Sequence, residues 1–314
     1  TLLDLVNILV GLALLFYGGD FLVTGSARLA RFLKISPFVI GATVIAFGTS
    51  APELAVAILA ALDAAPELAM GNVIGSNIAN IGLVLGITAM IAPIVIASKR
   101  FNREYPPFLL AAFLILFLAW DLKIHRLEGA IMVSLLALYI WRSLSHKEDL
   151  SSELEDEIGF LTDKGPAFQF LLIIGGLVSL VGGAKFLVSG GVSIARNIGI
   201  SEWFIGITIV AIGTSLPEIV SSIMAARRGH GEMAIGNIFG SNIFNILMVL
   251  GITSLIHPLN ISEPIHPDLI IATGITSLLL VLILFGKHSL GKISGATLLA
   301  TYFLYITLKG MGIL

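Results

Sequence analysis

The chain consists mainly of long apolar runs that are broken by short polar stretches. The runs are continuous and do not alternate with a period of two, which is typical of membrane-spanning helices and not of barrel strands. One helix per run predicts ten, near residues 3–31, 37–62, 67–93, 106–122, 127–144, 167–193, 202–226, 232–257, 268–286 and 290–310. We therefore predict an all-α membrane protein, because a helix satisfies its own backbone hydrogen bonds in lipid.

Two polar motifs inside these apolar runs occur twice. FVIGATVIAFGTSAPE (38–53) matches WFIGITIVAIGTSLPE (203–218) at nine of 16 positions. MGNVIGSNIANIGLVLGIT (70–88) matches IGNIFGSNIFNILMVLGIT (235–253) at 13 of 19. Both pairs are offset by 165 residues without a gap, and packing against lipid does not require the shared Gly, Thr, Ser, Asn, Pro and Glu. A duplicated polar motif in a hydrophobic chain indicates a transport site built by two halves.

The same offset also relates the first helices of the two halves, residues 14–31 and 179–196, so the whole half is repeated. We predict two five-helix repeats, 1–144 and 167–314, which together form one transmembrane domain. Residues 145–166 form an acidic linker between them. Its seven carboxylates favour a solvated connector, with a regulatory cation site as the alternative.

The odd number of helices per repeat predicts that the second repeat enters the membrane from the opposite side, as an inverted-topology repeat. The positive-inside rule sets the orientation. With the N-terminus outside, 13 of the 18 Lys and Arg residues fall on the inner side. We therefore expect both termini to be extracellular and the linker to be cytoplasmic.

Composition supports the membrane assignment and narrows the chemistry. The chain is 57% hydrophobic and only 12% charged, with a mean hydropathy of +1.01, whereas soluble domains carry about 25% charged residues. It has no cysteine, which excludes disulfides, thiol chemistry and Cys-ligated metals. A net charge of −2 gives no indication of a nucleic-acid partner, and we expect none.

Each repeat carries one glutamate, Glu53 or Glu218, near the middle of an apolar segment. An unpaired charge at that depth costs a few kcal/mol or more. No Lys or Arg stands at comparable depth in helices 37–62, 67–93, 202–226 and 232–257. A single buried glutamate could be a protonated structural residue. Two that recur with their surroundings favour a bound cation or proton as the neutralising partner.

The residues around these glutamates supply oxygen ligands. Pro52 and Pro217 lack an N–H, so each helix is expected to break at the adjacent Gly-Thr-Ser. Broken helices at membrane depth are tolerated where they line a site. The freed carbonyls, the carboxylates and the groups of Thr49, Ser50, Thr214 and Ser215 suit hard cations such as Ca²⁺. No histidine or thiol lies nearby, which argues against zinc, copper or iron.

The second motif adds a polar face. Ser76 and Asn80 are four residues apart, as are Ser241 and Asn245, so each pair shares one helical face. Each face can present a hydroxyl and an amide oxygen to the glutamates. A further set of asparagines either bridges helices or binds ions: Asn72, Asn77, Asn237 and Asn242.

Asp20 and Lys185 occupy equivalent positions in the two repeats. Because their charges are opposite, we expect a polar interfacial role for them and not a shared role as ion ligands.

At GTSAPE and GTSLPE, followed by GSNIAN and GSNIFN, the chain resembles the cation/Ca²⁺ exchanger superfamily, in particular the prokaryotic Na⁺/Ca²⁺ exchanger branch. The resemblance covers essentially the full chain. It implies ten helices, alternating access and exchange of about three Na⁺ for one Ca²⁺. It also implies that helices 3–31 and 167–193 slide against the core to switch access.

The resemblance further implies roles for individual residues. Ca²⁺ would be bound by the carboxylates of Glu53 and Glu218 and by the backbone oxygens of Thr49 and Thr214. Na⁺ would use the same carboxylates with Ser50, Ser76, Ser215, Ser241 and the carbonyls of Ala46 and Ala211, while Asn80 and Asn245 would line the centre. Some relatives, including K⁺-dependent exchangers, have Asp where this chain has Asn245, so potassium co-transport is less expected here.

The predicted function is an electrogenic Na⁺/Ca²⁺ antiporter in the plasma membrane, a multi-pass protein that works as a monomer in the lipid bilayer and uses its cargo ions without a cofactor. The alternative on the same scaffold is a Ca²⁺/H⁺ exchanger. A passive channel is less expected because it would not need inverted halves. An enzyme such as an intramembrane hydrolase is disfavoured because no histidine or lysine stands beside the Ser and Glu as a base.

Overall fold

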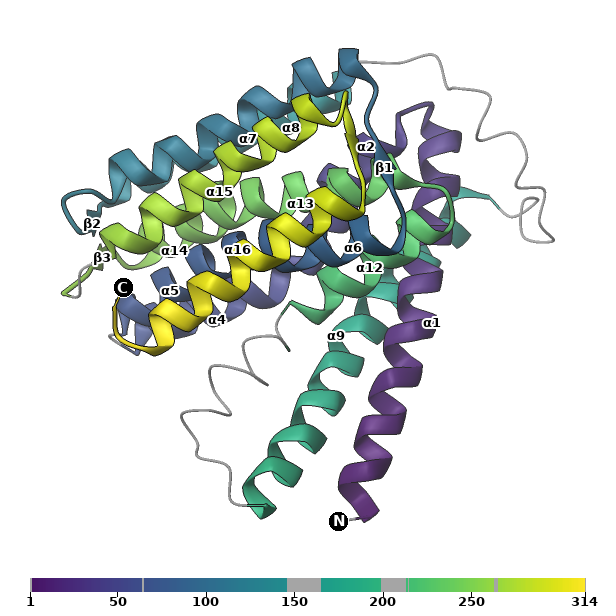
Figure 1. The fold of residues 1–314 in the computed structure, drawn as a ribbon, viewed down its shortest axis with the longest axis horizontal. Helices are drawn as coiled ribbons and strands as arrows, with labels where there is room; N and C mark the ends of the chain where they lie inside the picture. Colours follow the sequence, from purple (N-terminus) through teal and green to yellow (C-terminus); the bar gives the residue numbers. More distant parts are fainter. Residues whose placement is uncertain are drawn as a thin grey trace.

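The computed structural model describes residues 2–63, 65–145, 165–198, 213, 215–262 and 265–313. It is all-helical apart from four two-residue strands (Figure 1). Within these ranges seven helices are long and apolar enough to cross a membrane, and the bent segment 37–62 would make an eighth. The chain is therefore an all-helical membrane protein with seven or eight candidate spans. The count of ten and the positions of the termini stay predictions.

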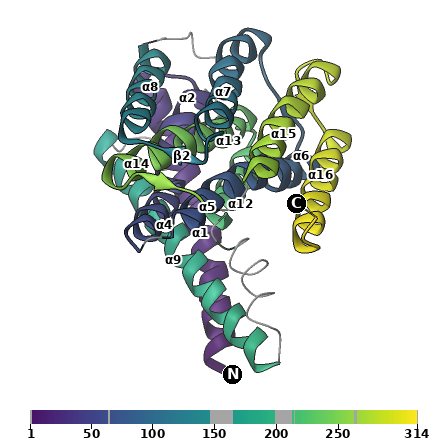
Figure 2. The ribbon, with the colours of Figure 1, turned by 90° about the vertical axis from the view of Figure 1, so that its left-hand side faces the viewer.

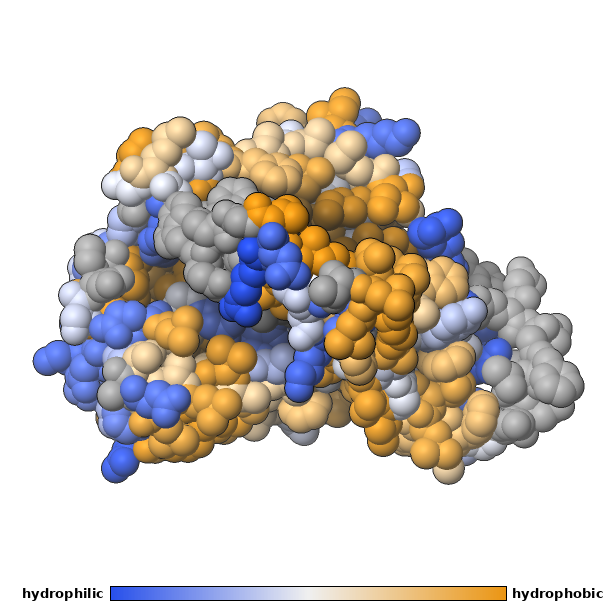
Figure 3. All heavy atoms as spheres, turned by 90° about the horizontal axis from the view of Figure 1, so that it is seen from below, coloured by the Kyte–Doolittle hydropathy of each residue, from blue (hydrophilic) through white to orange (hydrophobic). Residues whose placement is uncertain are grey.

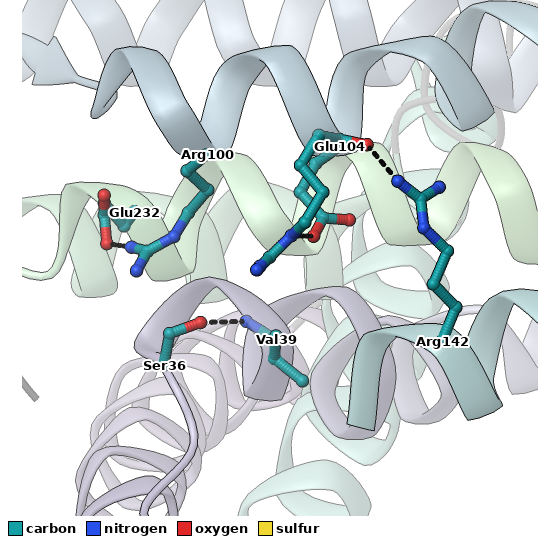
Figure 4. Close-up of polar contacts among 7 residues, drawn as sticks. Ser36, Val39, Arg100, Glu104, Arg142 and Glu232 are labelled. Atoms are coloured by element: carbon teal, nitrogen blue, oxygen red, sulfur yellow. Dashed lines mark hydrogen bonds and ion pairs between the residues drawn. The ribbon is translucent and has the colours of Figure 1, made fainter. Parts of the chain in front are cut away.

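The first repeat begins with a 32-residue helix, α1 (Leu2–Leu33). The segment predicted as helix 37–62 is divided into α2 (Pro37–Ile40), the π-helical η1 (Gly41–Ile45), α3 (Ala46–Thr49) and α4 (Ala51–Leu62). Ser36 caps α2 by accepting a hydrogen bond from the N–H of Val39 (3.3 Å, Figure 4). The next segment comprises α5 (Pro66–Ala79), η2 (Asn80–Leu85) and α6 (Gly86–Ile91), and the repeat ends with α7 (Ser98–Leu118) and α8 (Arg126–Ser145).

The second repeat has the same order. A 32-residue helix, α9 (Pro166–Asn197), is followed by α12 (Leu216–Arg227). The predicted linker at 145–166 and the first part of the predicted helix 202–226 lie largely outside the described residues. The chain continues through α13 (Gly231–Phe244), η5 (Asn245–Leu250) and α14 (Gly251–Ile256), and then α15 (His266–Phe285) and α16 (Lys292–Gly310).

Helix α7 begins at Ser98, eight residues before its predicted start, and therefore has two prolines in its interior. Pro106 and Pro107 have no N–H, so the carbonyl of Arg103 loses its usual partner four residues on. Arg142 on α8 supplies the missing donor at 3.1 Å (Figure 4). Arg100, one turn earlier, forms an ion pair with Glu232 on α13. These side-chain contacts allow a helix where the sequence pattern predicts a loop.

Helices α1 and α9 lie side by side and extend away from the other helices (Figures 1 and 2). Glycines bring their backbones together: a Cβ on Gly11 would lie 2.8 Å from the Gly183 carbonyl oxygen, and one on Gly176 would lie 2.8 Å from that of Gly18. The 165-residue offset converts one of these contacts into the other. The Ser179 hydroxyl likewise donates to the carbonyl of Leu14, its own repeat equivalent (2.9 Å). Such exchanged contacts indicate an approximate two-fold relation between the repeats.

Two short antiparallel ladders also join the halves. Strand β1 (Ile94–Val95) pairs with β4 (Ser289–Leu290), and β2 (Lys123–Ile124) pairs with β3 (Leu259–Asn260). Each ladder takes one strand from each repeat, so the repeats are interlocked.

The outer surface is rich in apolar side chains (Figure 3). Phe117 is 78% exposed and Phe285 is 85% exposed. Such exposure would be unfavourable in water but suits a lipid environment, and Trp120 and Trp141 at the ends of α7 and α8 fit the aromatic belt of a membrane protein.

Candidate functional site

Both predicted glutamates stand in the first turn of a half-helix. Glu53 is the third residue of α4, and Glu218 is the third residue of α12. The helix carrying Glu53 bends by 42° at the break before α4, where Ser50 lies between α3 and α4. Pro52 and Pro217 are the second residues of α4 and α12, within the first turn, where an N–H would have no partner inside the helix. The prediction of a broken helix is thus confirmed in the first repeat.

The half-helices influence the charge of their glutamates. The N-terminus of a helix carries a partial positive charge that favours a nearby carboxylate. Glu53 is only 2% exposed and Glu218 only 1%. The two side chains are near enough for the charge of Glu53 to act on Glu218. The site therefore places two carboxyl groups in a region from which bulk water is excluded.

The central oxygens lack protein donors. Among the described residues, no hydrogen-bond partner reaches Oε2 of Glu53 or either carboxylate oxygen of Glu218. The Thr49 hydroxyl comes near Glu218 without meeting hydrogen-bond geometry. Four further buried oxygens are likewise unpartnered: the hydroxyl of Ser50 and the amide oxygens of Asn80, Asn242 and Asn245. Buried polar atoms normally have a hydrogen-bond partner, so a cluster of buried oxygens without protein donors is suited to bind a cation or water.

Hydroxyl groups join the two repeats beside the glutamates. Thr49 on α3 contacts the Ser241 hydroxyl on α13 at 3.3 Å, and its hydroxyl lies 3.5 Å from Oδ1 of Asn237. Asn237 donates to Ser221 (3.1 Å) and to Ser222 (3.0 Å) on α12. Asn237 therefore connects α13 to the half-helix that carries Glu218. Sequence reasoning missed the serine pair because nothing in the first repeat corresponds to it.

Asparagines meet where the two repeats cross. Asn77 donates to the carbonyl of Asn242, its repeat equivalent (3.4 Å), and Asn245 donates to Oδ1 of Asn77 (3.1 Å). Asn72 donates to the carbonyl of Glu53 (3.2 Å). The side chains of Asn72, Asn77 and Asn237 thus bridge helices, which was one of the two roles expected for these asparagines, whereas the Asn242 side chain donates to the carbonyl of Ile238 in its own helix (2.9 Å).

A π-helical segment begins at each central asparagine. Segment η2 starts at Asn80 and η5 starts at Asn245. Short π-helical stretches inside α-helices often mark functional sites. Both asparagines are almost fully buried. No sequence pattern predicts a π-helix here.

The other predicted ligands lie on the same elements, and those described are buried. These are Ala46, Ser50, Ser76, Ser215 and Ser241. The Ala46 carbonyl accepts the N–H of Ser50 (3.0 Å) and the hydroxyl of Thr49 (3.4 Å). Ala211 and Thr214 lie outside the described residues.

The donor set is composed of oxygen alone. In the described part of the chain, no group of three or more His, Cys, Asp or Glu residues is placed to hold a metal ion. The centre instead combines two carboxylates with hydroxyls, amides and backbone carbonyls. Such oxygen donors suit Na⁺ and Ca²⁺ better than transition metals.

Several known proteins are similar to this chain in sequence or in fold. An uncharacterised membrane protein of Methanocaldococcus jannaschii is 38% identical over 305 residues, covering 97% of both chains. The sodium/calcium exchanger MaX1 of Methanosarcina acetivorans is 31% identical over 293 residues, covering 82% of this chain and 84% of the relative. The solved structure of the sodium-calcium exchanger NCX_Mj, soaked with 10 mM Na⁺ and zero Ca²⁺, superposes with a TM-score of 0.84 at 36% identity, covering 98% of both chains.

The family comparison agrees with the internal duplication. The family described as sodium/calcium exchanger protein matches this chain twice, at residues 3–145 and 168–311. The resemblance inferred from the paired motifs is therefore confirmed, and the chain belongs to the sodium/calcium exchanger family.

Proposed function

We propose that this chain is a Na⁺/Ca²⁺ antiporter whose two buried glutamates bind the exchanged cations in turn. The observation that carries the proposal is the set of buried oxygens around Glu53 and Glu218 without protein donors. Family membership supports cation exchange. Na⁺ and Ca²⁺ are then cargo, and the protein is a transporter and not an enzyme.

The proposed ligands are those of the sequence analysis. Ca²⁺ takes six to eight oxygens, and the two carboxylates balance its charge. The backbone oxygens of Thr49 and Thr214 join the carboxylates around Ca²⁺. Na⁺ uses the same carboxylates with the hydroxyls of Ser50, Ser76, Ser215 and Ser241 and the carbonyls of Ala46 and Ala211, while Asn80 and Asn245 line the centre. Because the site carries two negative charges, Ca²⁺ and a full set of Na⁺ exclude one another. This exclusion couples the two fluxes.

The proposed architecture places both termini outside and ten spans in two inverted repeats, 1–144 and 167–314, with residues 145–166 as a cytoplasmic linker. Access alternates between the two sides of the membrane, and the monomer in the plasma membrane is the working unit. Exchange of about three Na⁺ per Ca²⁺ would move one net charge. A potential of 100 mV then contributes about 2.3 kcal/mol per cycle.

The test is ⁴⁵Ca²⁺ uptake into proteoliposomes preloaded with Na⁺, K⁺ or choline at matched pH. We expect uptake only with internal Na⁺, and we expect an imposed membrane potential to change its rate. Equal uptake under all three conditions would contradict sodium coupling. An imposed pH gradient would then separate Ca²⁺/H⁺ exchange from passive conduction.

A further inference from the structure

An ion pair fastens α1 to the half-helix that carries Glu218. Asp20 on α1 pairs with Arg228, the C-cap residue directly after α12. Arg228 also donates from Nη1 to the hydroxyl of Thr24 (2.7 Å). The helices touch beside this pair, since a Cβ on Gly19 would lie 2.7 Å from Val220. The ion pair thus lies where α1 packs against α12.

The other repeat carries the same three positions with the charges exchanged. The 165-residue offset places Lys185 at the position of Asp20, Asp63 at that of Arg228 and Ser189 at that of Thr24. The local structure is equivalent, because Asp63 is the C-cap residue of α4 and Arg228 is the C-cap residue of α12. Each contributes its backbone N–H to the carbonyl four residues earlier, Leu59 and Met224 respectively. The two sets therefore differ in charge and not in backbone placement.

In the second set, Lys185 on α9 and Asp63 after α4 are not in contact in this structure. Lys185 and Asp63 are both exposed, and in the described ranges neither forms an ion pair. Helix α9 lacks the packing against α4 that α1 makes against α12, and Figure 1 shows the two helices well separated. A lysine on a membrane helix without a partner is costly and is a functional candidate.

We propose that Asp20–Arg228 and Lys185–Asp63 are two alternating latches, one for each side of the membrane. This inference rests on the proposed exchange by alternating access. In the present conformation the first latch is closed and the second is open. In the opposite conformation α9 packs against α4, Lys185 meets Asp63, and Asp20 separates from Arg228. With the predicted orientation the closed latch is cytoplasmic, so this conformation is open to the outside.

The exchange of charges explains why each long helix closes on only one half-helix. Asp20 meeting Asp63, or Lys185 meeting Arg228, would bring like charges together, so wrong pairings repel. The Asp20 and Arg228 side chains are 28% and 32% exposed. Exposed ion pairs contribute little stability, so each latch can open during every cycle. Because the first turns of α4 and α12 carry Glu53 and Glu218, each latch contacts a helix that carries one of the proposed cation ligands.

The chain has no cysteine, so cross-linking of paired cysteines tests the proposal without background. We would compare Asp20→Cys/Arg228→Cys, Asp63→Cys/Lys185→Cys and the mismatched control Asp20→Cys/Asp63→Cys. The cross-linker is reducible and thiol-reactive, with a spacer about as long as the two side chains. Each variant is reconstituted with internal Na⁺ and external Ca²⁺.

We expect both matched pairs to cross-link, the control not to, and each cross-link to stop ⁴⁵Ca²⁺ uptake until it is reduced. If Asp63→Cys/Lys185→Cys never cross-links above the control while the wild type transports, the latches are refuted. If the wild type shows no sodium-dependent uptake, the proposed function fails instead.

A charge variant gives an independent readout. In the Asp63→Cys/Lys185→Cys background, Asp20→Arg introduces repulsion from Arg228 and should raise the cross-linking rate roughly two- to five-fold, the scale of an exposed ion pair. Adding Arg228→Asp restores the attraction and should return the rate to its starting value. An unchanged rate in both variants would overturn the proposal even if either variant transports poorly.

Discussion

Glu53 and Glu218 are nearly inaccessible to solvent, and three of their four carboxylate oxygens have no hydrogen-bond partner in the described residues. Each lies in the first turn of a half-helix, directly after a proline. This combination favours a positive ligand over a purely structural role. The neighbouring amide of Asn245 contributes an oxygen without adding charge.

At the residue scale we predict that Asn245→Asp changes cation coupling. A third buried carboxylate beside Asn77 would raise the negative charge of the site and favour additional monovalent cations. The dependence of ⁴⁵Ca²⁺ uptake on internal Na⁺ and K⁺ should shift by several-fold. Asn260→Asp, at the exposed position of strand β3, is the matched control. Identical cation dependence in both variants and the wild type would show that position 245 does not influence coupling.

Much of the site was predictable from residue identity, because Ser, Thr, Asn and Glu have no packing role in an apolar segment. The paired motifs predicted that Thr49 and Ser241 belong to one region, and the structure places their hydroxyls 3.3 Å apart. The connection from Asn237 to Ser221 and Ser222 was not predictable, since it depends on which helix faces which. The residue roles toward Na⁺ and Ca²⁺ stay proposals.

At the element scale, the helices were predictable from the length of their apolar runs. Their irregular features, such as prolines inside a helix and π-helical segments, were not. Helix α7 continues through Pro106 and Pro107 because Arg142, distant in sequence, replaces a lost donor. The π-helical segments at Asn80 and Asn245 likewise have no local sequence signal. Close packing of α1 against α9 depends on glycines whose facing residue only the fold reveals.

We predict that Gly183→Ala weakens the contact between α1 and α9. Its Cβ would lie 2.8 Å from the N–H nitrogen of Leu15 and 2.9 Å from the Gly11 carbonyl oxygen, so the helices must separate. Overpacking of this kind costs about 1–3 kcal/mol. Gly182→Ala is a matched control, because no described atom lies within 4 Å of its added Cβ. A thermal-unfolding midpoint in detergent should fall for Gly183→Ala alone, and equal midpoints would contradict this packing.

At the scale of the whole molecule, the two repeats exchange equivalent contacts at the glycines of α1 and α9 and at the two strand pairs. If each repeat has the proposed five spans, this two-fold relation places their equivalent loops on opposite sides of the membrane. The sequence predicted this relation from the constant offset of 165 residues. It could not predict that the present conformation is asymmetric, because that depends on packing between α1 and α12.

Equivalent residues on opposite sides test the inverted topology. Arg126 and Lys292 are exposed at the starts of α8 and α16, in corresponding connections of the two repeats. A membrane-impermeant maleimide should label Arg126→Cys in intact cells and should label Lys292→Cys only after permeabilisation. The cysteine-free wild type is the blank. Labelling of both variants in intact cells would contradict the inverted arrangement.

The most direct test of the whole account is sodium-driven ⁴⁵Ca²⁺ uptake by Glu53→Gln and Glu218→Gln, with Glu67→Gln, in the first turn of α5, as control. A unit charge about 4 Å from another contributes about 4 kcal/mol at an effective dielectric constant of 20, and twice that toward a divalent cation. We predict that either central variant loses measurable uptake while Glu67→Gln retains it. Wild-type uptake in either central variant, with the protein folded and reconstituted, would contradict the two-carboxylate site.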